Sequence, residues 1–176
     1  MSDIRYNGWL HRSGTGGVYQ DSSGKVGIGT SVPNMALHVL SSSDDVARIQ
    51  STNGTSGPAL TLDHIGSSPA DDDIIGKIVF NGEDDGNNST TYADIRVISS
   101  DVSNGSEDGD ITFGTRAAGS YGEKLRITSA GDVGIGEATP DQKLHITDNT
   151  HPYIRTTLND TTVSTNDVFG AWEFES

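Results

Sequence analysis

Two histidines in matching surroundings are the first residues of this chain that could do chemistry. His38 and His145 each lie between a leucine and a β-branched residue. Because side chains alternate along a strand, this pattern predicts a structural histidine on the outward face of a strand. The alternative is an ion held by three symmetry-related copies of one histidine on a three-fold axis, which requires inward-facing side chains. With no cysteine in the chain, neither a thiolate metal site nor a disulfide framework is available.

Clusters of carboxylates are the second candidate for chemistry. They occur at residues 71–73, 83–85 and 107–110, and a glycosidase needs two carboxyl groups around its bond. Adjacent acids in polar loops are typical of solvated turns, and the sequence offers no aromatic-lined cleft for a sugar. We therefore expect no catalytic residues here, and we keep a polysaccharide depolymerase as an alternative function.

One acidic loop is similar to the first half of a calcium-binding loop. Asn104, Ser106 and Asp108 stand at alternate positions before Gly109. Position twelve of this loop is Thr115, where a calcium loop has a bidentate glutamate. Incidental calcium binding is left open at this loop.

The glycines at positions 24, 27 and 29 superficially resemble a phosphate-binding loop. Lys25 precedes the later glycines, whereas such a loop needs its lysine after them, and no amphipathic helix follows. The motifs Gly-x-Ser-x-Gly and His-Glu-x-x-His are missing as well. The sequence predicts a protein that is not an enzyme and that uses no cofactor and no metal.

Composition limits how this chain can fold and what it can bind. Of its 176 residues 32% are hydrophobic and 22 are glycine, so a large private core is hard to assemble and core shared between copies is expected. A formal charge of −14 repels phosphate backbones and anionic headgroups. We expect no nucleic-acid partner and no membrane insertion, and the N-terminus lacks the apolar stretch of a signal peptide.

The sequence repeats itself. The segment 24–39 recurs at 131–146, 107 positions later, with eight of sixteen residues identical. A second match relates residues 73–80 to 167–174 at an offset of 94, so the second copy lacks about thirteen residues, placed between 52 and 72.

The repeat predicts three parts along the chain. These are an N-terminal attachment segment with the end of a first β unit (1–22), a full β unit (23–130) and the start of a second unit (131–176). Because the second unit is interrupted at Ser176 and Met1 is retained, we expect a longer polypeptide of which this is the N-terminal portion.

Short β-branched or alternating runs predict strands at residues 74–80, 92–98, 111–115 and 125–127. Polar turn clusters at 81–88 and 103–109 separate them. The only helical turns expected are short ones after Pro33 and Pro140. The predicted fold class is all-β.

The repeated glycine motif places β-branched side chains on one face of a strand and glycines on the other. A face without side chains lets another backbone approach closely, as chains wound around a common axis require. We predict that the motif packs the chains of a trimer. Its residues are Val26, Gly27, Ile28, Gly29, Val133, Gly134, Ile135 and Gly136.

These motifs resemble a repeat of bacteriophage tail fibre proteins. The likeness rests on Gly-x-Val-Gly-Ile-Gly-x-x-x-Pro followed by Leu-His-Val or Leu-His-Ile, on the strands at 108–115 and 126–128, and on the pairing of 76–82 with 92–95. The resemblance implies an elongated, intertwined homotrimeric fibre. It also implies a virion location after synthesis in the host cytoplasm, a phage tail or baseplate protein as partner, and a host surface receptor bound through a distal region outside this chain.

The first residues are the candidates for docking on the tail. Tyr6, Trp9 and Leu10 precede the repeat, and aromatic anchors are enriched at interfaces. Packing of Trp9 against the first strands is the alternative. A trimeric bacterial surface adhesin is a further alternative function, and it would require an export signal.

Overall fold

The computed structural model describes residues 8–10, 17–150 and 152–155. Every regular element in these residues is a β-strand, so the predicted all-β class is confirmed. The described residues accordingly hold no helix of the length and apolarity that a membrane crossing demands. The chain divides into two compact units, Met1–Leu60 and Thr61–Ser176. The predicted boundaries after residues 22 and 130 fall within these units, in the turns that join consecutive strands.

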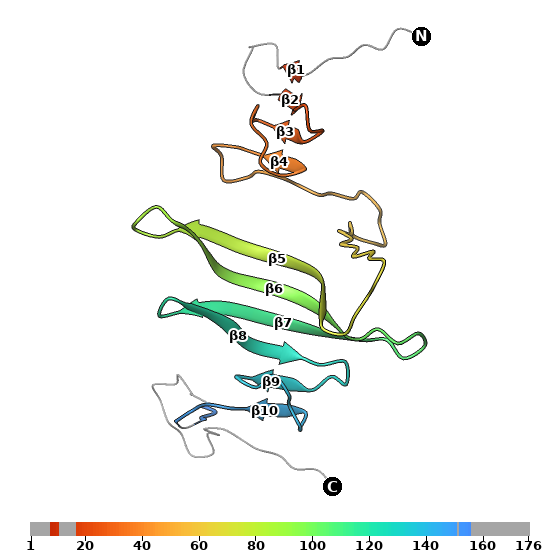
Figure 1. Cartoon of the computed structure of the whole chain (residues 1–176), viewed down its shortest axis with the longest axis vertical. Coiled ribbons are helices and arrows are strands. Elements are labelled where there is room, and N and C mark those ends of the chain that lie inside the picture. The colour runs from red at the N-terminus through yellow and green to blue at the C-terminus, as the bar shows by residue number, and fades with distance from the viewer. Residues whose placement is uncertain (1–7, 11–16, 151, 156–176) are drawn as a thin grey trace, which may run out of the picture. The chain divides into compact units, whose positions relative to one another are not determined.

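The unit Met1–Leu60 contains one four-stranded sheet, in the order β1-β2-β3-β4 (Figure 1). Its first two pairings are antiparallel, and the last is parallel. The strands are β1 (Gly8–Leu10), β2 (Gly17–Gln20), β3 (Val26–Ile28) and β4 (Leu37–Val39).

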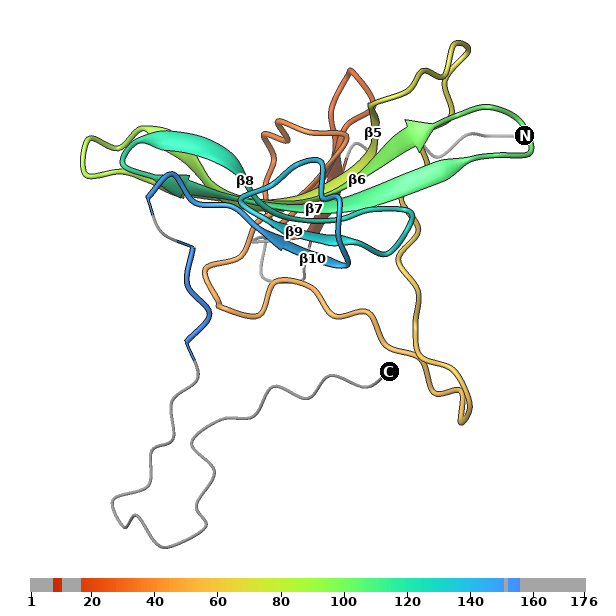
Figure 2. The same cartoon turned by 90° about the horizontal axis from the view of Figure 1, so that it is seen from below.

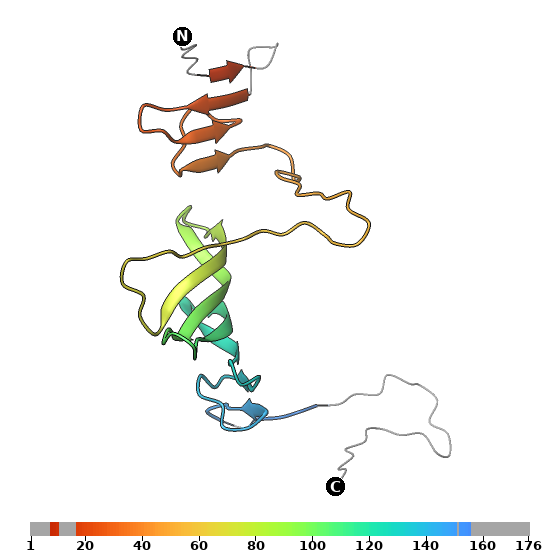
Figure 3. The same ribbon diagram turned by 90° about the vertical axis from the view of Figure 1, so that its right-hand side faces the viewer.

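The unit Thr61–Ser176 contains a six-stranded sheet, in the order β10-β9-β8-β7-β6-β5. All neighbours are antiparallel except β9 and β10. Views from below and from the side show a strongly twisted single layer (Figure 2, Figure 3). The strands are β5 (Asp73–Glu83), β6 (Ser89–Asp101), β7 (Asp108–Ala117), β8 (Ser120–Ile127), β9 (Val133–Ile135) and β10 (Leu144–Ile146).

The two copies of the glycine motif have the same strand pairing. Gly27 pairs with His38 in the parallel ladder of β3 and β4, and Gly134 pairs with His145 in that of β9 and β10. Each pair also has an antiparallel strand on its other side, β2 or β8. The repeated sequence therefore builds the same three-stranded arrangement twice.

The helical turns expected after Pro33 and Pro140 were wrong, because these loops are bends. Each loop joins two parallel strands, so it must carry the chain back to the end of the sheet at which the first strand began. The amide of Val26 donates to the carbonyl of Ala36 at 2.8 Å, and that of Val133 donates to Lys143 at 3.0 Å. A loop that spans the sheet edge in so few residues needs extended backbone, because a helix rises only about 1.5 Å per residue.

The four long strands, β5 to β8, are longer than predicted. Pairing extends β5 to Glu83 and starts β7 at Asp108, inside the polar clusters for which the sequence predicts turns. The hydroxyl of Thr91 donates to the amide oxygen of Asn81 at 2.8 Å, which supports the end of the β5–β6 ladder. The remaining turn is closed by Asp84, whose carboxylate accepts from neighbouring backbone amides.

No hydrophobic side chain among the described residues is buried. Positions that are buried belong instead to polar residues, glycines and one proline. In the part of the chain that the structure describes, the fold thus has ladders of strands and no apolar core.

Candidate functional site

One face of the six-stranded sheet is apolar from edge to edge. Directly paired residues on neighbouring strands have side chains on the same face, so the register defines two rows that cross all six strands. The first row is Gly76, Val97, Ile111, Ile127, Val133 and Leu144, and the second is Ile78, Ile95, Phe113, Leu125, Ile135 and Ile146. We call these two rows the apolar face.

The apolar face is uncovered in the single chain. Phe113 and Ile111, in the middle of the sheet, are 37% and 40% exposed. Their neighbours on the opposite face, Thr112 and Asp110, are 3% and 6% exposed. Burial is therefore the reverse of what a strand with one apolar side normally shows.

A segment of the same chain touches one edge of this face. The side chain of Leu62 lies over Gly76, within 3.1 Å of the point that a Cβ atom would occupy. Leu62 also helps to line a cavity of about 290 Å³, whose apolar walls include Ile78, Ile95 and Val97. Gly76 thus leaves space in the first row, and Leu62 fills part of it.

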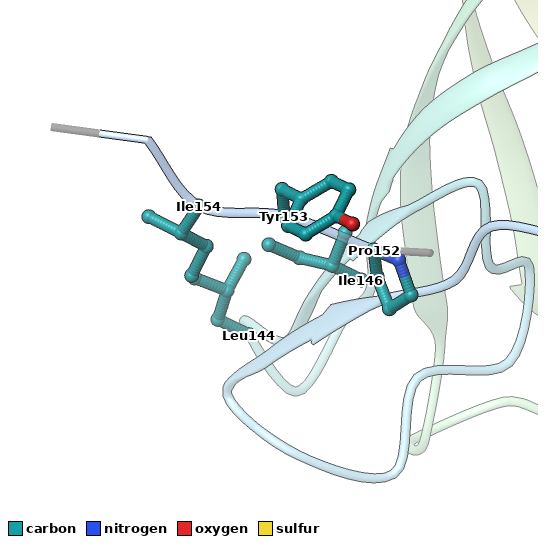
Figure 4. A pocket seen from close by; sticks show the side chains of 5 residues that line it. All are labelled: Leu144, Ile146, Pro152, Tyr153 and Ile154. Atoms are coloured by element: carbon teal, nitrogen blue, oxygen red, sulfur yellow. The ribbon is translucent and has the colours of Figure 1, made fainter. Parts of the chain in front are cut away.

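The other edge of the face has a second cavity, of about 210 Å³ (Figure 4). Leu144 and Ile146 of β10 face Tyr153 and Ile154 across it, beside Pro152. The chain after β10 therefore returns toward the apolar face. It leaves this edge open, because Leu144 is 52% exposed.

The opposite face, which we call the polar face, is held by charged side chains. Asp94, only 4% exposed, receives the hydroxyl of Tyr121 and a bond of 2.7 Å from Nε of Arg96. Bonding to Asp94 raises the pKa of Arg96. Burial, and then the bond to Asp94, raises the pKa of Tyr121 above its ordinary 10.0. The guanidinium of Arg96 also lies 5.1 Å from the centre of the Tyr121 ring.

A second charged group lies beside the first on β7 and β8. Arg126 bonds Glu123 through two nitrogens at 2.9 Å and Asp110 through Nη1 at 2.7 Å. The bond to Glu123 is the main cause that raises the pKa of Arg126. Asp110 also accepts from the backbone amide of Ser129 at 3.0 Å. The buried carboxylates of the polar face therefore have cationic partners within the same chain, whereas the side chains of the apolar face are left exposed.

The local geometry of the chain itself explains why the repeated motif contains glycines. A Cβ atom on Gly27 would overlap the carbonyl oxygen of Thr30, and one on Gly134 would overlap that of Glu137. Gly29 and Gly136 have positive φ angles of 77° and 71°. Each glycine is needed for the sharp exit from its strand, so its presence does not require the backbone of another chain.

The other residues of the motif are placed by the register. Val133 and Ile135 belong to the apolar face, and Val26 and Ile28 take the equivalent positions beside β2 and β4. Ile28 and Ile135 are 40% and 41% exposed. These four side chains are available for packing against another chain.

The two histidines lie in the ladder opposite the motif glycines, and so on the face away from the β-branched rows. Nδ1 of His145 is 3.1 Å from a carboxylate oxygen of Asp141 without hydrogen-bond alignment, and Nδ1 of His38 is buried with no partner. The residues that the structure describes contain no group of three or more acidic or histidine side chains that could hold a metal.

The carboxylates of the acidic loop between β6 and β7 stabilise its turn. Asp101 and Glu107 accept bonds from the amides of Ser103 and Gly105, at 2.6 and 3.1 Å. The side chain of Ser103, and then its amide, lower the pKa of Asp101, and the amide of Gly105 lowers that of Glu107. Thr115, the twelfth position of the calcium-like loop, lies within β7 and pairs with Ala93. It is therefore part of the sheet rather than of the loop.

The predicted docking residues are only partly placed. Trp9 and Leu10 belong to β1 and pair with Val18 and Gly17 of β2. Tyr6 lies outside the described residues. The pairing makes β1 part of the first sheet, and it leaves the docking prediction as it stood.

Sequence reasoning missed the charged groups of the polar face. Asp94 and Tyr121 are 27 positions apart, and their contact depends on the register of three strands. The available signal was the alternation of Asp110, Thr112 and Gly114 with apolar residues. No protein-family model matches the chain, and the search of curated proteins gave no match either. The likeness to tail fibres therefore rests on the sequence motifs.

Proposed function

We propose that this chain is a structural protein that associates with itself through the apolar face and forms part of a trimeric fibre. The observation that carries the proposal is a single-layer sheet with two apolar rows across six strands and no buried hydrophobic side chain in the described residues. Burying apolar surface contributes about 25 cal/mol per Å². A sheet with this face open to water gains most of its stability by covering it with another copy.

The choice of three copies rests on the sequence motifs shared with tail fibres. Three twisted single-layer sheets can turn their apolar sides toward a common axis and their polar sides toward water. The polar face suits an outer surface, because its buried carboxylates are already paired with Arg96 and Arg126. In this arrangement His38 and His145 face away from the axis, which favours their structural role.

The remaining parts of the proposal follow the tail-fibre resemblance. The fibre is a virion component, its first residues dock on a tail or baseplate protein, and its repeats form the shaft below a distal receptor-binding region. Deleting residues 1–7, which precede β1, is expected to leave assembly intact and to reduce incorporation into particles. Full fibre occupancy in electron micrographs of particles with the shortened chain would exclude docking through these residues.

The association can be tested by thiol labelling, because the chain has no cysteine of its own. Val97→Cys places a thiol on the apolar face, and Lys124→Cys places a matched thiol on β8 outside both rows. The proposal predicts that maleimide labels Val97→Cys about tenfold more slowly than Lys124→Cys in the native protein, and equally fast in urea. Equal native rates would show that the apolar face stays open.

The depolymerase alternative makes a different prediction. Incubation of the purified chain with host capsule or lipopolysaccharide would release oligosaccharide if the acidic clusters were catalytic. A structural protein releases none, and its labelling pattern is unchanged by the polysaccharide.

A further inference from the structure

A cavity of about 230 Å³ lies on the polar face, over β5, β6, β7 and β8. It is smaller than the pockets of drug-sized ligands, and so is suited to a small molecule or ion. Because it lies on the side away from the apolar face, covering that face with another copy leaves the cavity open. Polar residues dominate its lining, namely Lys77, Thr91, Asp94, Arg96, Arg116 and Tyr121.

The charge of this cavity is opposite to that of the chain. Three of the eleven lysines and arginines line it, namely Lys77, Arg96 and Arg116, together with a single carboxylate, Asp94. Three positive charges and one negative charge give a local formal charge of +2, in a chain whose formal charge is −14. A concave cationic site in an acidic surface concentrates small anions.

The two guanidinium groups are held in place by bonds that use only some of their nitrogens. Arg116 donates from Nε to the carbonyl of Thr91 at 2.8 Å and from Nη1 to that of Gly119 at 2.5 Å. Arg96 bonds Asp94 through Nε and Nη2. Nη2 of Arg116 is left without a hydrogen-bond partner among the described residues, whereas the Arg96 guanidinium interacts further with the hydroxyl of Tyr121.

The third cation, Lys77, is not held by hydrogen bonds of this kind. Lys77 is exposed, and its ammonium group bonds none of the residues that the structure describes. Asp94, by contrast, is already paired with the charge of Arg96 and accepts a hydrogen bond from the hydroxyl of Tyr121. The cavity thus combines two anchored guanidinium groups with one ammonium group that has no bond to the described residues, a donor set that matches the oxygens of an oxoanion.

We propose that this cavity binds a small oxoanion with a charge of −2, such as sulfate, hydrogen phosphate or a short dicarboxylate. The ligand neutralises the local charge of +2 and accepts from Lys77, Arg96 and Arg116 together. Fixed guanidinium groups reduce the ordering that binding requires. This site is independent of the proposed assembly, because none of the residues that line it belongs to the two rows of the apolar face.

Equilibrium dialysis of radiolabelled sulfate against the full chain tests the proposal, with chloride to hold the ionic strength constant. One saturable site per chain is expected, from which malonate and phosphate displace the label. Lys77→Gln should weaken binding about fivefold, the upper range for an exposed charge pair, and Lys77→Arg should restore it. The matched control Lys124→Gln removes the same charge from outside the cavity and should leave binding unchanged.

Three results would overturn the proposal. They are the absence of saturable sulfate binding in the native protein, an unchanged affinity in Lys77→Gln, and an equal loss in Lys124→Gln, which would mean that only overall charge matters. Displacement by malonate alone or by phosphate alone would identify which oxoanion the site prefers.

Discussion

Thr112 and Phe113 are consecutive residues of β7, and the threonine is 3% exposed whereas the phenylalanine is 37% exposed. The threonine pairs with Arg96 on one side and with Arg126 on the other, so long charged side chains flank it on the polar face. The phenylalanine, at the centre of the apolar face, has only its paired neighbours in the same sheet, Ile95 and Leu125, beside it. A strand with this inversion is stable only when something covers its apolar side, and we propose that further copies of the chain cover it.

Replacing Phe113 by Asp should therefore dissociate the assembly. The change removes the burial of an aromatic side chain and places a charge in an apolar contact, at an expected cost of more than about 2 kcal/mol per chain. Sedimentation velocity at several concentrations measures the effect. Gln142→Asp adds the same charge in the loop between β9 and β10 and should sediment like the unchanged protein. Identical behaviour of the two variants would argue against the apolar face as the contact.

Gly27 and Gly134 should tolerate no side chain, because a side chain there would clash with the backbone of the same chain. Gly27→Val and Gly134→Val would drive a Cβ atom into the carbonyl oxygens of Thr30 and Glu137. A loss of more than about 2 kcal/mol in the free energy of unfolding is expected for each. Gly54→Val is the matched control, since nothing lies within 4 Å of its Cβ position. Urea unfolding midpoints that do not separate the motif variants from the control would contradict this geometry.

Much of the fold could be predicted from sequence, and the part that could not has a physical cause. The period-two pattern of β7 tells which residues share a face, as with Ile111 and Phe113. It does not tell which face is covered, and this depends on residues distant in sequence, such as Arg126 above Asp110. The bulge between Phe113 and Gly114 decides that Glu123 joins the polar face, and no local signal marks it.

Arg126 should be the most costly charge to remove from the polar face. Arg126→Met leaves Asp110, 6% exposed, and Glu123 without their cation. Breaking a largely buried pair in this way costs about 3 kcal/mol. Arg48→Met removes an exposed arginine from the segment after β4 and should change the unfolding free energy by less than about 0.5 kcal/mol. Chemical denaturation of both variants measures the difference, and equal small losses would show that the Asp110 pair contributes little.

Tyr121 should make stability fall at alkaline pH. Its pKa in the folded chain is raised above the ordinary 10.0 that it regains on unfolding. The neutral hydroxyl is thus favoured by folding, so its contribution is complete below pH 10 and is lost as the pH rises through the folded-state pKa. The variant Tyr121→Phe has no group that titrates at this position. The difference in free energy of unfolding between this variant and the native protein should therefore change only above pH 10. Urea unfolding from pH 8 to pH 11 gives both curves, and parallel curves would rule out this role.

The mass of the assembly in solution tests the central claim most directly. Sedimentation equilibrium of the purified chain, over micromolar to submicromolar concentrations, should give about three times the chain mass of 18.5 kDa, with dissociation accompanied by loss of β structure. A monodisperse, fully folded species of 18.5 kDa across the same range would contradict the account, because it would show that the sheet is stable with its apolar face open to water.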